Sequence, residues 1–162
     1  MIALSSAGAD DRAGVVSDPA LPPGRALVQV VALLFGLSIL LLGVLGFIPR
    51  VTTGWDEMRV AGDESQAQVL GVFQTSVLHN LIHAIAGVVG IVAARKPDNA
   101  RSFLVGGGIV FVALWLLGIV GGADWIPSDT ADNWLHLGLG ASMIASGLLF
   151  TRGGAVSRRD RQ

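Results

Sequence analysis

Four long apolar runs constrain the fold of this 162-residue chain more than any other feature of its sequence. They cover residues 26–48, 77–94, 103–123 and 131–150. A helix rises about 1.5 Å per residue, so the first run alone would measure roughly 35 Å and cross a bilayer core about 30 Å thick. We therefore expect an all-α fold, an integral membrane four-helix bundle with one span in each run.

The composition excludes several other classes of protein. Hydrophobic residues make up 52% of the chain and charged residues only 14%, whereas about 25% of a soluble domain is charged. The net charge of −1 provides no basic field that would bind nucleic acid. Because the chain has no cysteine, disulfides, thiolate metal sites, iron–sulfur clusters and cysteine nucleophiles are excluded.

The basic residues predict the orientation in the membrane. Of the 11 Lys and Arg residues, only Arg50 and Arg59 fall in the links after the first and third runs. By the positive-inside rule, both termini should be cytoplasmic and the protein should lie in the plasma (inner) membrane. The expected organisation is a disordered tail over residues 1–25, a transmembrane domain over 26–151 and a basic tail over 152–162.

The link after the first run is long and contains a helix-start signal. Asp63 followed by Gln66 is typical of a capping box. Apolar residues that would form one face of a helix then follow, namely Val69, Leu70, Val72 and Phe73. We expect a short interfacial helix here, with a partly ordered loop as the alternative.

The two halves of the chain resemble each other. An aromatic residue, Ile and Pro end the first run at residues 47–49 and the third at 125–127, an offset of 78 that also aligns Gly43 with Gly121. Each half would form a helical hairpin with the same orientation. The two hairpins would then be related by a parallel pseudo-repeat about an axis along the membrane normal.

A polar motif opens the second and fourth runs, 53 residues apart. Its pattern is an acid or His, Asn, two apolar residues, His and, four residues later, Gly. In the second run its polar members are His79, Asn80 and His83, followed by Gly87; in the fourth they are Asp132, Asn133 and His136, followed by Gly140. Residues four apart share one helix face, and the repeat makes His83 and His136 symmetry mates.

Two interpretations of this polar cluster stay open. In the first, which we favour, the six polar side chains form an interhelical clamp between the second and fourth helices, and Gly87 and Gly140 allow close helix packing. In the second, the donors His79, His83, Asp132 and His136 bind a transition metal. A variant of the second places a flat haem ring beside the glycines, ligated by His83 and His136. Neither haem nor a metal is preferred.

The motifs LGVFQ (70–74), LHNLIH (78–83) and ADNWLHL (131–137) resemble those of a family of small, largely actinobacterial, four-helix membrane proteins, the domain of unknown function 4383 family. The likeness extends over roughly residues 26–150. It implies a four-helix inner-membrane protein, and it carries no activity or ligand with it.

The sequence thus predicts a structural or accessory membrane protein rather than an enzyme, because no nucleophile motif or pair of carboxylates lies within a span. Its expected partners are the lipid bilayer and either a second copy of itself or another membrane protein. The alternative function is a haem- or metal-binding membrane protein that uses His83 and His136 with His79 and Asp132.

Overall fold

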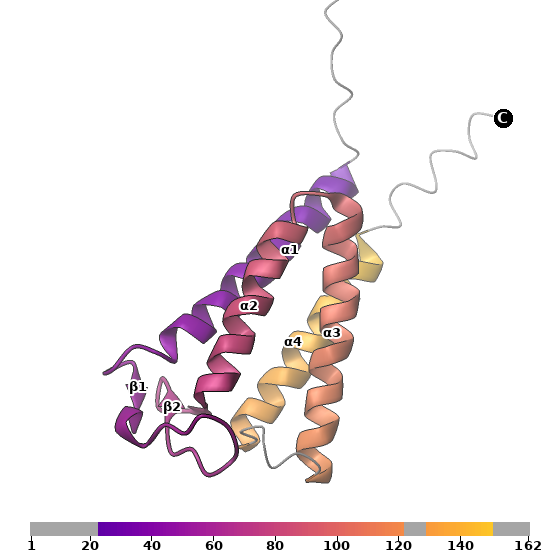
Figure 1. Cartoon of the computed structure of the whole chain (residues 1–162). Helices are drawn as coiled ribbons and strands as arrows, with labels where there is room; N and C mark the ends of the chain where they lie inside the picture. Colours follow the sequence, from indigo (N-terminus) through magenta and orange to yellow (C-terminus); the bar gives the residue numbers. More distant parts are fainter. Residues whose placement is uncertain (1–22, 122–128, 151–162) are drawn as a thin grey trace, which may run out of the picture.

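The computed structural model describes residues 23–121 and 129–150. Within them the chain forms four helices, which are α1 (Pro23–Leu45), α2 (Val77–Ala93), α3 (Pro97–Val120) and α4 (Thr130–Leu149). Helix α1 packs along α2 and α3 packs along α4, so the helices form two hairpin pairs (Figure 1). The expected tails and the residues 125–127 of the sequence repeat lie outside the described residues.

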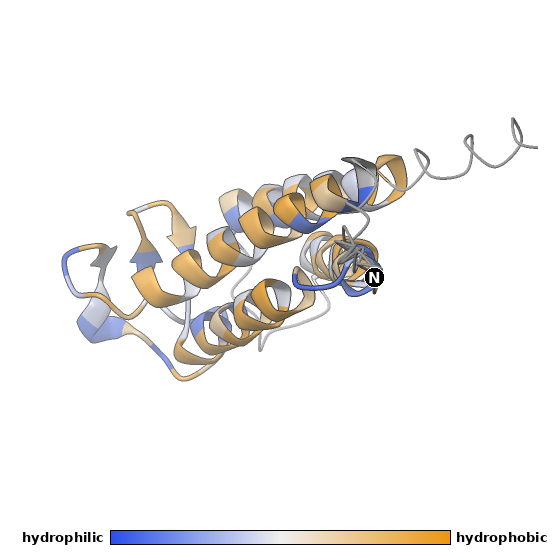
Figure 2. Ribbon diagram, turned by 90° about the horizontal axis from the view of Figure 1, so that it is seen from above, coloured by the Kyte–Doolittle hydropathy of each residue, from blue (hydrophilic) through white to orange (hydrophobic). Residues whose placement is uncertain are grey.

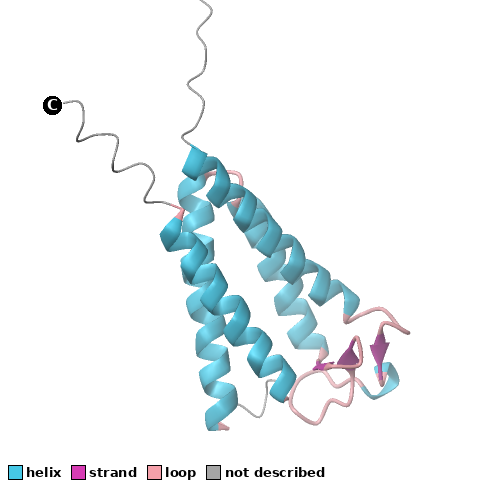
Figure 3. Ribbon diagram, turned by 180° about the vertical axis from the view of Figure 1, so that it is seen from behind, coloured by secondary structure: helices cyan, strands magenta, loops and turns pink. Residues whose placement is uncertain are grey.

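The bundle has two different ends. The short α2–α3 link, the start of α1 and the end of α4 lie together at one end, which we call the link end (Figure 1). The long α1–α2 connection lies at the opposite end, the sheet end. The two hairpins approach each other at the link end and lean apart toward the sheet end (Figures 1 and 3).

Two of the helices are long and apolar enough to cross a membrane. They are the segment Arg25–Leu45 of α1 and the whole of α3, while α2 is an apolar helix of 17 residues. Large hydrophobic side chains such as Leu34, Leu41, Ile85 and Ile109 are more than half exposed on the outer helix faces. Figure 2 shows these faces as mainly hydrophobic, which is the pattern that a lipid environment favours.

The helix boundaries differ modestly from the predicted ones. Helix α1 ends at Leu45 rather than at residue 48. Helix α3 begins at Pro97, six residues before the apolar run at 103, because Pro is well accommodated in the first turn, where its missing N–H leaves no hydrogen bond unmade. The start of α2 at Val77 agrees with the prediction.

The expectation of an interfacial helix after Asp63 was wrong. This segment instead forms an antiparallel sheet in the order β1-β2-β3, whose strands are β1 (Thr52–Thr53), β2 (Gln68–Val69) and β3 (Phe73–Gln74), with a short 3-10 turn η1 (Trp55–Glu57). The turn between β2 and β3 places Leu70 at φ 56° and Gly71 at φ 69°. These left-handed residues cannot continue a right-handed helix, so the fold is mostly, not entirely, helical.

Close backbone contacts hold each hairpin together. A Cβ atom added to Gly87 of α2 would overlap the backbone of Leu40 in α1, and one on Gly140 of α4 would lie 2.8 Å from the Gly108 carbonyl oxygen in α3. The apolar core lies toward the link end and includes Val28, Ala32, Ala94, Ala100, Leu104 and Met143, all of them buried. Between the hairpins, the sheet end is filled by polar side chains.

Candidate functional site

Matching N-terminal caps position the polar residues of α2 and α4. The Ser76 hydroxyl accepts a hydrogen bond from the His79 backbone N–H at 3.2 Å, and the Asp129 carboxylate accepts one from the Asp132 N–H at 2.8 Å. Such caps satisfy backbone donors that the first helical turn leaves free. His79 and Asp132 therefore occupy the same position in their helices, with His83 and His136 one turn further along.

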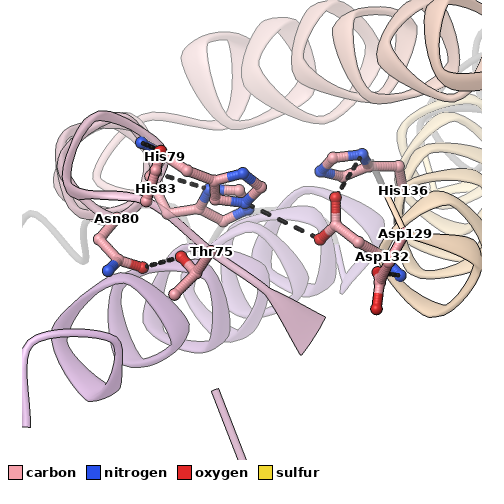
Figure 4. Close-up of polar contacts among 8 residues, drawn as sticks. Thr75, His79, Asn80, His83, Asp129, Asp132 and His136 are labelled. Carbon is pink, nitrogen blue, oxygen red and sulfur yellow. Dashed lines mark hydrogen bonds and ion pairs between the residues drawn. The ribbon is translucent and has the colours of Figure 1, made fainter. Parts of the chain in front are cut away.

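Three imidazole rings meet between the hairpins (Figure 4). The His79 and His83 rings are stacked, with centroids 4.3 Å apart and planes inclined by 6°. The His136 ring lies 5.8 Å from the His79 ring and 6.0 Å from the His83 ring. One ring nitrogen of each histidine lies within 4.8 Å of those of the other two, so α2 and α4 bring three nitrogen donors together.

The Asp132 carboxylate lies beside these rings and is 2% exposed. One oxygen is 3.8 Å from His79 Nε2 and the other is 3.5 Å from His136 Nδ1. Both separations exceed ordinary N–H···O distances of about 2.7–3.2 Å. The carboxylate therefore faces both helices at ion-pair distance without a short hydrogen bond to either ring.

The His83 ring is oriented by its own helix. Its Nδ1 atom lies 3.1 Å from the His79 carbonyl oxygen. A carbonyl oxygen only accepts hydrogen bonds, so Nδ1 carries the proton in this contact. The lone pair of a neutral His83 then resides on Nε2, which is the arrangement of a histidine prepared for metal binding.

Two buried polar atoms of the site, Asp132 Oδ2 and His136 Nε2, have no hydrogen-bond partner among the residues that the structure describes. Leaving a buried polar atom without a partner costs about 1–3 kcal/mol. Both atoms belong to the group of side chains that meets between α2 and α4. A water molecule or an ion placed between these helices would satisfy both atoms.

The space beside the cluster is small. A cavity of about 20 Å3 is bordered by His79, His83 and Asp132 on the helices, and by Phe73 and Thr75 on the sheet side. Phe111 of α3 contacts the cluster from another side, with its ring 5.5 Å from the His136 ring and 5.9 Å from the His83 ring. This volume suits one water molecule or one metal ion.

The two asparagines of the predicted cluster make their close contacts inside the hairpins, and Asn80 also borders the cavity. Asn80 is buried against Gly46 at the end of α1, and its Oδ1 accepts a hydrogen bond of 2.5 Å from the Thr75 hydroxyl (Figure 4). Asn133 occupies the corresponding place against Gly118 of α3. The asparagines thus lie within the hairpins, while the histidines and Asp132 lie between them.

The two glycines of the motif are also inside the hairpins. Gly87 faces Leu40, and Gly140 faces Gly108 and Val112, each at backbone contact. The space that a flat ring would need beside these glycines is therefore filled by α1 and α3.

Other residues of the site were not predicted. Ser76 and Asp129 carry the signal of a capping residue just before an apolar run, and this signal was available in the sequence. Phe111 is one apolar residue within a long apolar run, and Thr75 precedes its helix, so nothing in either position distinguishes it in the sequence.

The family comparison covers the residues of this site. The family described as domain of unknown function DUF4383 matches residues 29–149, which include both histidine motifs and almost all of the four helices. The chain belongs to the DUF4383 family. None of the curated proteins or solved structures compared with the chain matches it. Membership of DUF4383 carries no activity, so the chemistry is argued from the side chains.

Proposed function

We propose that this DUF4383 protein is a multi-pass membrane protein that binds one divalent transition-metal ion between its two hairpins. His79, His83 and His136 would bind the ion through nitrogen, and Asp132 would provide an oxygen ligand. The observation that carries the proposal is that two buried atoms, His136 Nε2 and Asp132 Oδ2, have no hydrogen bond to any described residue and lie beside the other two imidazoles.

The donor set favours particular metals. Imidazole nitrogen and carboxylate oxygen bind Zn²⁺ well and also suit Fe²⁺, Co²⁺ and Ni²⁺, whereas Cu⁺ prefers sulfur ligands. The chain has no cysteine, and the site residues include no sulfur. Three nitrogens and one oxygen from the protein make a four-coordinate Zn²⁺ site, the closed type that stabilises structure.

Metal binding would tighten the cluster. Zn–N bonds of about 2.0–2.1 Å place the ligand nitrogens of a tetrahedral site roughly 3.4 Å apart, closer than the 4.8 Å limit seen here. Because a ligand lone pair lies in the plane of its ring, the stacked His79 and His83 rings must also tilt to point at one ion.

A metal ion also provides the clamp expected from the sequence. The part of the chain that the structure describes has no hydrogen bond between a side chain of α2 and one of α4, and its ion pair between these helices is the 3.8 Å contact of His79 with Asp132. A shared ion would connect the two helices where direct hydrogen bonds do not. This supports a structural or accessory role rather than catalysis, since a closed site leaves no coordination position for substrate.

A haem is less well supported. The cavity beside the histidines measures about 20 Å3, far below the roughly 300 Å3 at which ligand pockets begin. Haem insertion would require the hairpins to separate along α2 and α4. We therefore propose a metal ion without a porphyrin.

The membrane topology is part of the same proposal. Helices α1 and α3 are long enough to cross, and the 17 residues of α2 fall at the lower limit for a span. Arg95, Lys96 and Arg101 lie at the link end and the acidic residues Asp56, Glu57, Asp63 and Glu64 lie at the sheet end. The positive-inside rule then supports four spans in the plasma membrane, with the link end and both termini in the cytoplasm.

We also infer that the two hairpins form a pseudo-repeat. Matching contacts with α2 and α4 are made by two sets of residues that differ by a constant offset of 72. The first set, in α1 and just after its end, is 36, 40 and 46, and the second set, in α3, is 108, 112 and 118. The partner residues 80, 87 and 133, 140 keep the offset of 53. Gly43 and Gly121 do not match, because Gly43 packs against Ala84 whereas Gly121 ends α3 in a left-handed conformation. The offset of 72 therefore replaces the sequence alignment at 78.

The test is the metal content of the purified protein. Wild-type protein and the variants His83→Ala, His136→Ala and Asn133→Ala are purified in detergent from metal-replete cells and analysed for Zn, Fe, Co, Ni and Cu. We expect one metal ion per chain in the wild type and in Asn133→Ala, whose side chain lies against Gly118 inside the second hairpin, and loss of the ion in both histidine variants. A wild-type protein that holds no metal and takes up none on titration with Zn²⁺ or Co²⁺ would overturn the proposal.

A further inference from the structure

A second site lies at the opposite end of the bundle from the histidines. A groove of about 310 Å3 runs between α1 and α2 at the link end, where it is lined by Gln29, Val30, Leu33, Ile91, Ala94 and Arg95. Four of these side chains are aliphatic, and Val30 is 51% exposed. The volume falls at the lower end of pockets that bind small organic ligands.

The polar residues of the groove are fixed at its rim. The Gln29 side-chain amide donates to the Ala94 carbonyl at 2.9 Å and to the Arg95 carbonyl at 3.0 Å. These carbonyls follow the last turn of α2 and have no helical N–H of their own to accept from. Gln29 thus fixes the backbone from which the exposed Arg95 side chain extends.

The charge around the rim is positive. Asp98 is paired with Arg25, with 3.0 Å between a guanidinium nitrogen and a carboxylate oxygen, so its charge is balanced. Three basic residues remain exposed at this end, Arg95, Lys96 and Arg101, and none of them forms an ion pair with another residue that the structure describes. Of the three, only Arg95 lines the groove. The rim therefore attracts anions, while the groove below it offers an apolar surface.

We propose that this groove binds an anionic phospholipid, with one acyl chain against Val30, Leu33 and Ile91 and the phosphate against Arg95. Basic pockets between helices at the cytoplasmic face bind anionic lipid headgroups in this way. The combination of an apolar groove and a net positive rim matches a molecule with a chain at one end and a negative charge at the other. The inference rests on the proposed membrane insertion and is independent of the metal site.

The experiment compares lipids of equal chain length on the full-length protein. Detergent-solubilised protein is mixed with phosphatidylglycerol or phosphatidylcholine, and the retained lipid is counted by native mass spectrometry. The variants are Arg95→Gln, which removes the rim charge, Leu33→Trp, which fills the groove, and Arg101→Gln. The last is the matched control, because it removes the same charge from the same end of the bundle but outside the groove lining.

We expect the wild type and Arg101→Gln to retain phosphatidylglycerol in preference to phosphatidylcholine. Arg95→Gln should weaken phosphatidylglycerol binding about fivefold, the change that corresponds to about 1 kcal/mol for one basic residue at a membrane surface. Leu33→Trp should reduce the retention of phosphatidylglycerol while keeping every charge.

Three results would overturn the lipid proposal. They are equal retention of the two lipids by the wild type, equal losses in Arg95→Gln and Arg101→Gln, and no effect of Leu33→Trp. Fractionation of the wild-type protein with membranes is checked in the same preparation, so that a failure of membrane insertion is distinguished from a failure of the groove. Metal content is checked as well, because it should be the same in all three variants.

Discussion

At the scale of single residues, the metal proposal depends most on the two buried atoms without a hydrogen bond. Within the described part of the chain, His136 Nε2 and Asp132 Oδ2 are buried without a hydrogen bond, while His83 Nδ1 donates one to the His79 carbonyl. A buried polar atom without a hydrogen bond destabilises the folded protein unless a ligand binds to that atom. The effect of replacing it therefore distinguishes a ligand site from an interhelical hydrogen-bonded clamp.

His136→Phe is the first prediction. In the presence of a chelator, this variant should unfold close to the wild-type temperature, because an apolar ring replaces one nitrogen that has no hydrogen bond and a second that is 3.5 Å from Asp132, beyond ordinary hydrogen-bond distance. With Zn²⁺ present, only the wild type should gain stability, since a ligand that binds the folded state stabilises it by mass action. Thermal unfolding in detergent, with chelator and with Zn²⁺, measures the unfolding temperature of both proteins under each condition. A loss of stability of several kcal/mol in the chelated variant would instead favour the clamp.

Asp132→Asn is the second prediction. The amide keeps the size of the side chain but removes its charge, so affinity for Zn²⁺ should fall at least about 10–100-fold, the loss that removal of even an outer-shell partner of a metal ligand causes. Titration against a competing chelator measures the affinity. Asp129→Asn is the control, because Asn caps helices as well as Asp does. Equal affinities in Asp132→Asn and the wild type would remove Asp132 from the site.

Sequence reasoning identified the histidines and Asp132, because their spacing of four residues places each pair on one helix face. It could not separate them from Asn80 and Asn133. These neighbours differ by one position, or about 100° around the helix, and only the packing partner of each face determines which side chain points at the other hairpin. Phe111 was missed because an apolar residue within an apolar helix carries no distinguishing signal.

At the scale of elements, glycine contacts set the geometry of the two hairpins. Gly87 and Gly140 bring α2 against α1 and α4 against α3 at backbone distance, and this packing positions the first turns of α2 and α4. Outward-facing glycines do not contribute to the packing within a hairpin. One of them is Gly138 of α4, where an added Cβ would have no atom within 4 Å. The hairpins are thus sensitive to added volume at some glycines and tolerant at others.

Gly87→Ala is the third prediction. Its methyl group would overlap Leu40, and such overpacking destabilises by about 1–3 kcal/mol. Gly138→Ala is the matched control on an open face, where replacing Gly by Ala in a helix stabilises by about 0.5–1 kcal/mol. Thermal unfolding of both variants should therefore shift in opposite directions. Shifts in the same direction would show that Gly87 does not sit at a close contact.

The helices were predictable and the sheet was not, for different physical reasons. Each helix corresponds to a long apolar run, which is the strongest signal that a single sequence carries. The segment before α2 alternates instead, with Ser65, Ala67 and Val69 buried and Gln66 exposed. This period of two is typical of a strand, but strands β2 and β3 are only two residues long, so the pattern is short. The capping pattern at Asp63 predicts a helix instead.

At the scale of the whole molecule, the two ends of the bundle differ in chemistry. The sheet end carries acidic residues and covers the histidine cluster, and the link end carries basic residues and the α1–α2 groove. The proposed topology places the metal site toward the outer surface and the groove at the cytoplasmic surface. The orientation of the protein in the membrane therefore determines which side of the membrane each proposed site faces.

Cysteine labelling in intact cells is the fourth prediction. The natural chain has no cysteine, so single cysteines can be placed at exposed positions of either end. Glu57→Cys at the sheet end should react with a membrane-impermeant maleimide in intact cells, whereas Asn99→Cys at the link end should react only after permeabilisation. Equal labelling of the two variants in intact cells would contradict the proposed orientation.

X-ray absorption at the zinc edge tests the central claim most directly. The zinc-loaded protein should show four nitrogen or oxygen neighbours at about 2.0–2.1 Å, with the outer-shell scattering of three imidazole rings. His83→Ala, loaded in the same way, should lose this signature together with the metal. A spectrum from the wild type without imidazole scattering, or a protein that cannot be loaded, would contradict a metal site between the hairpins.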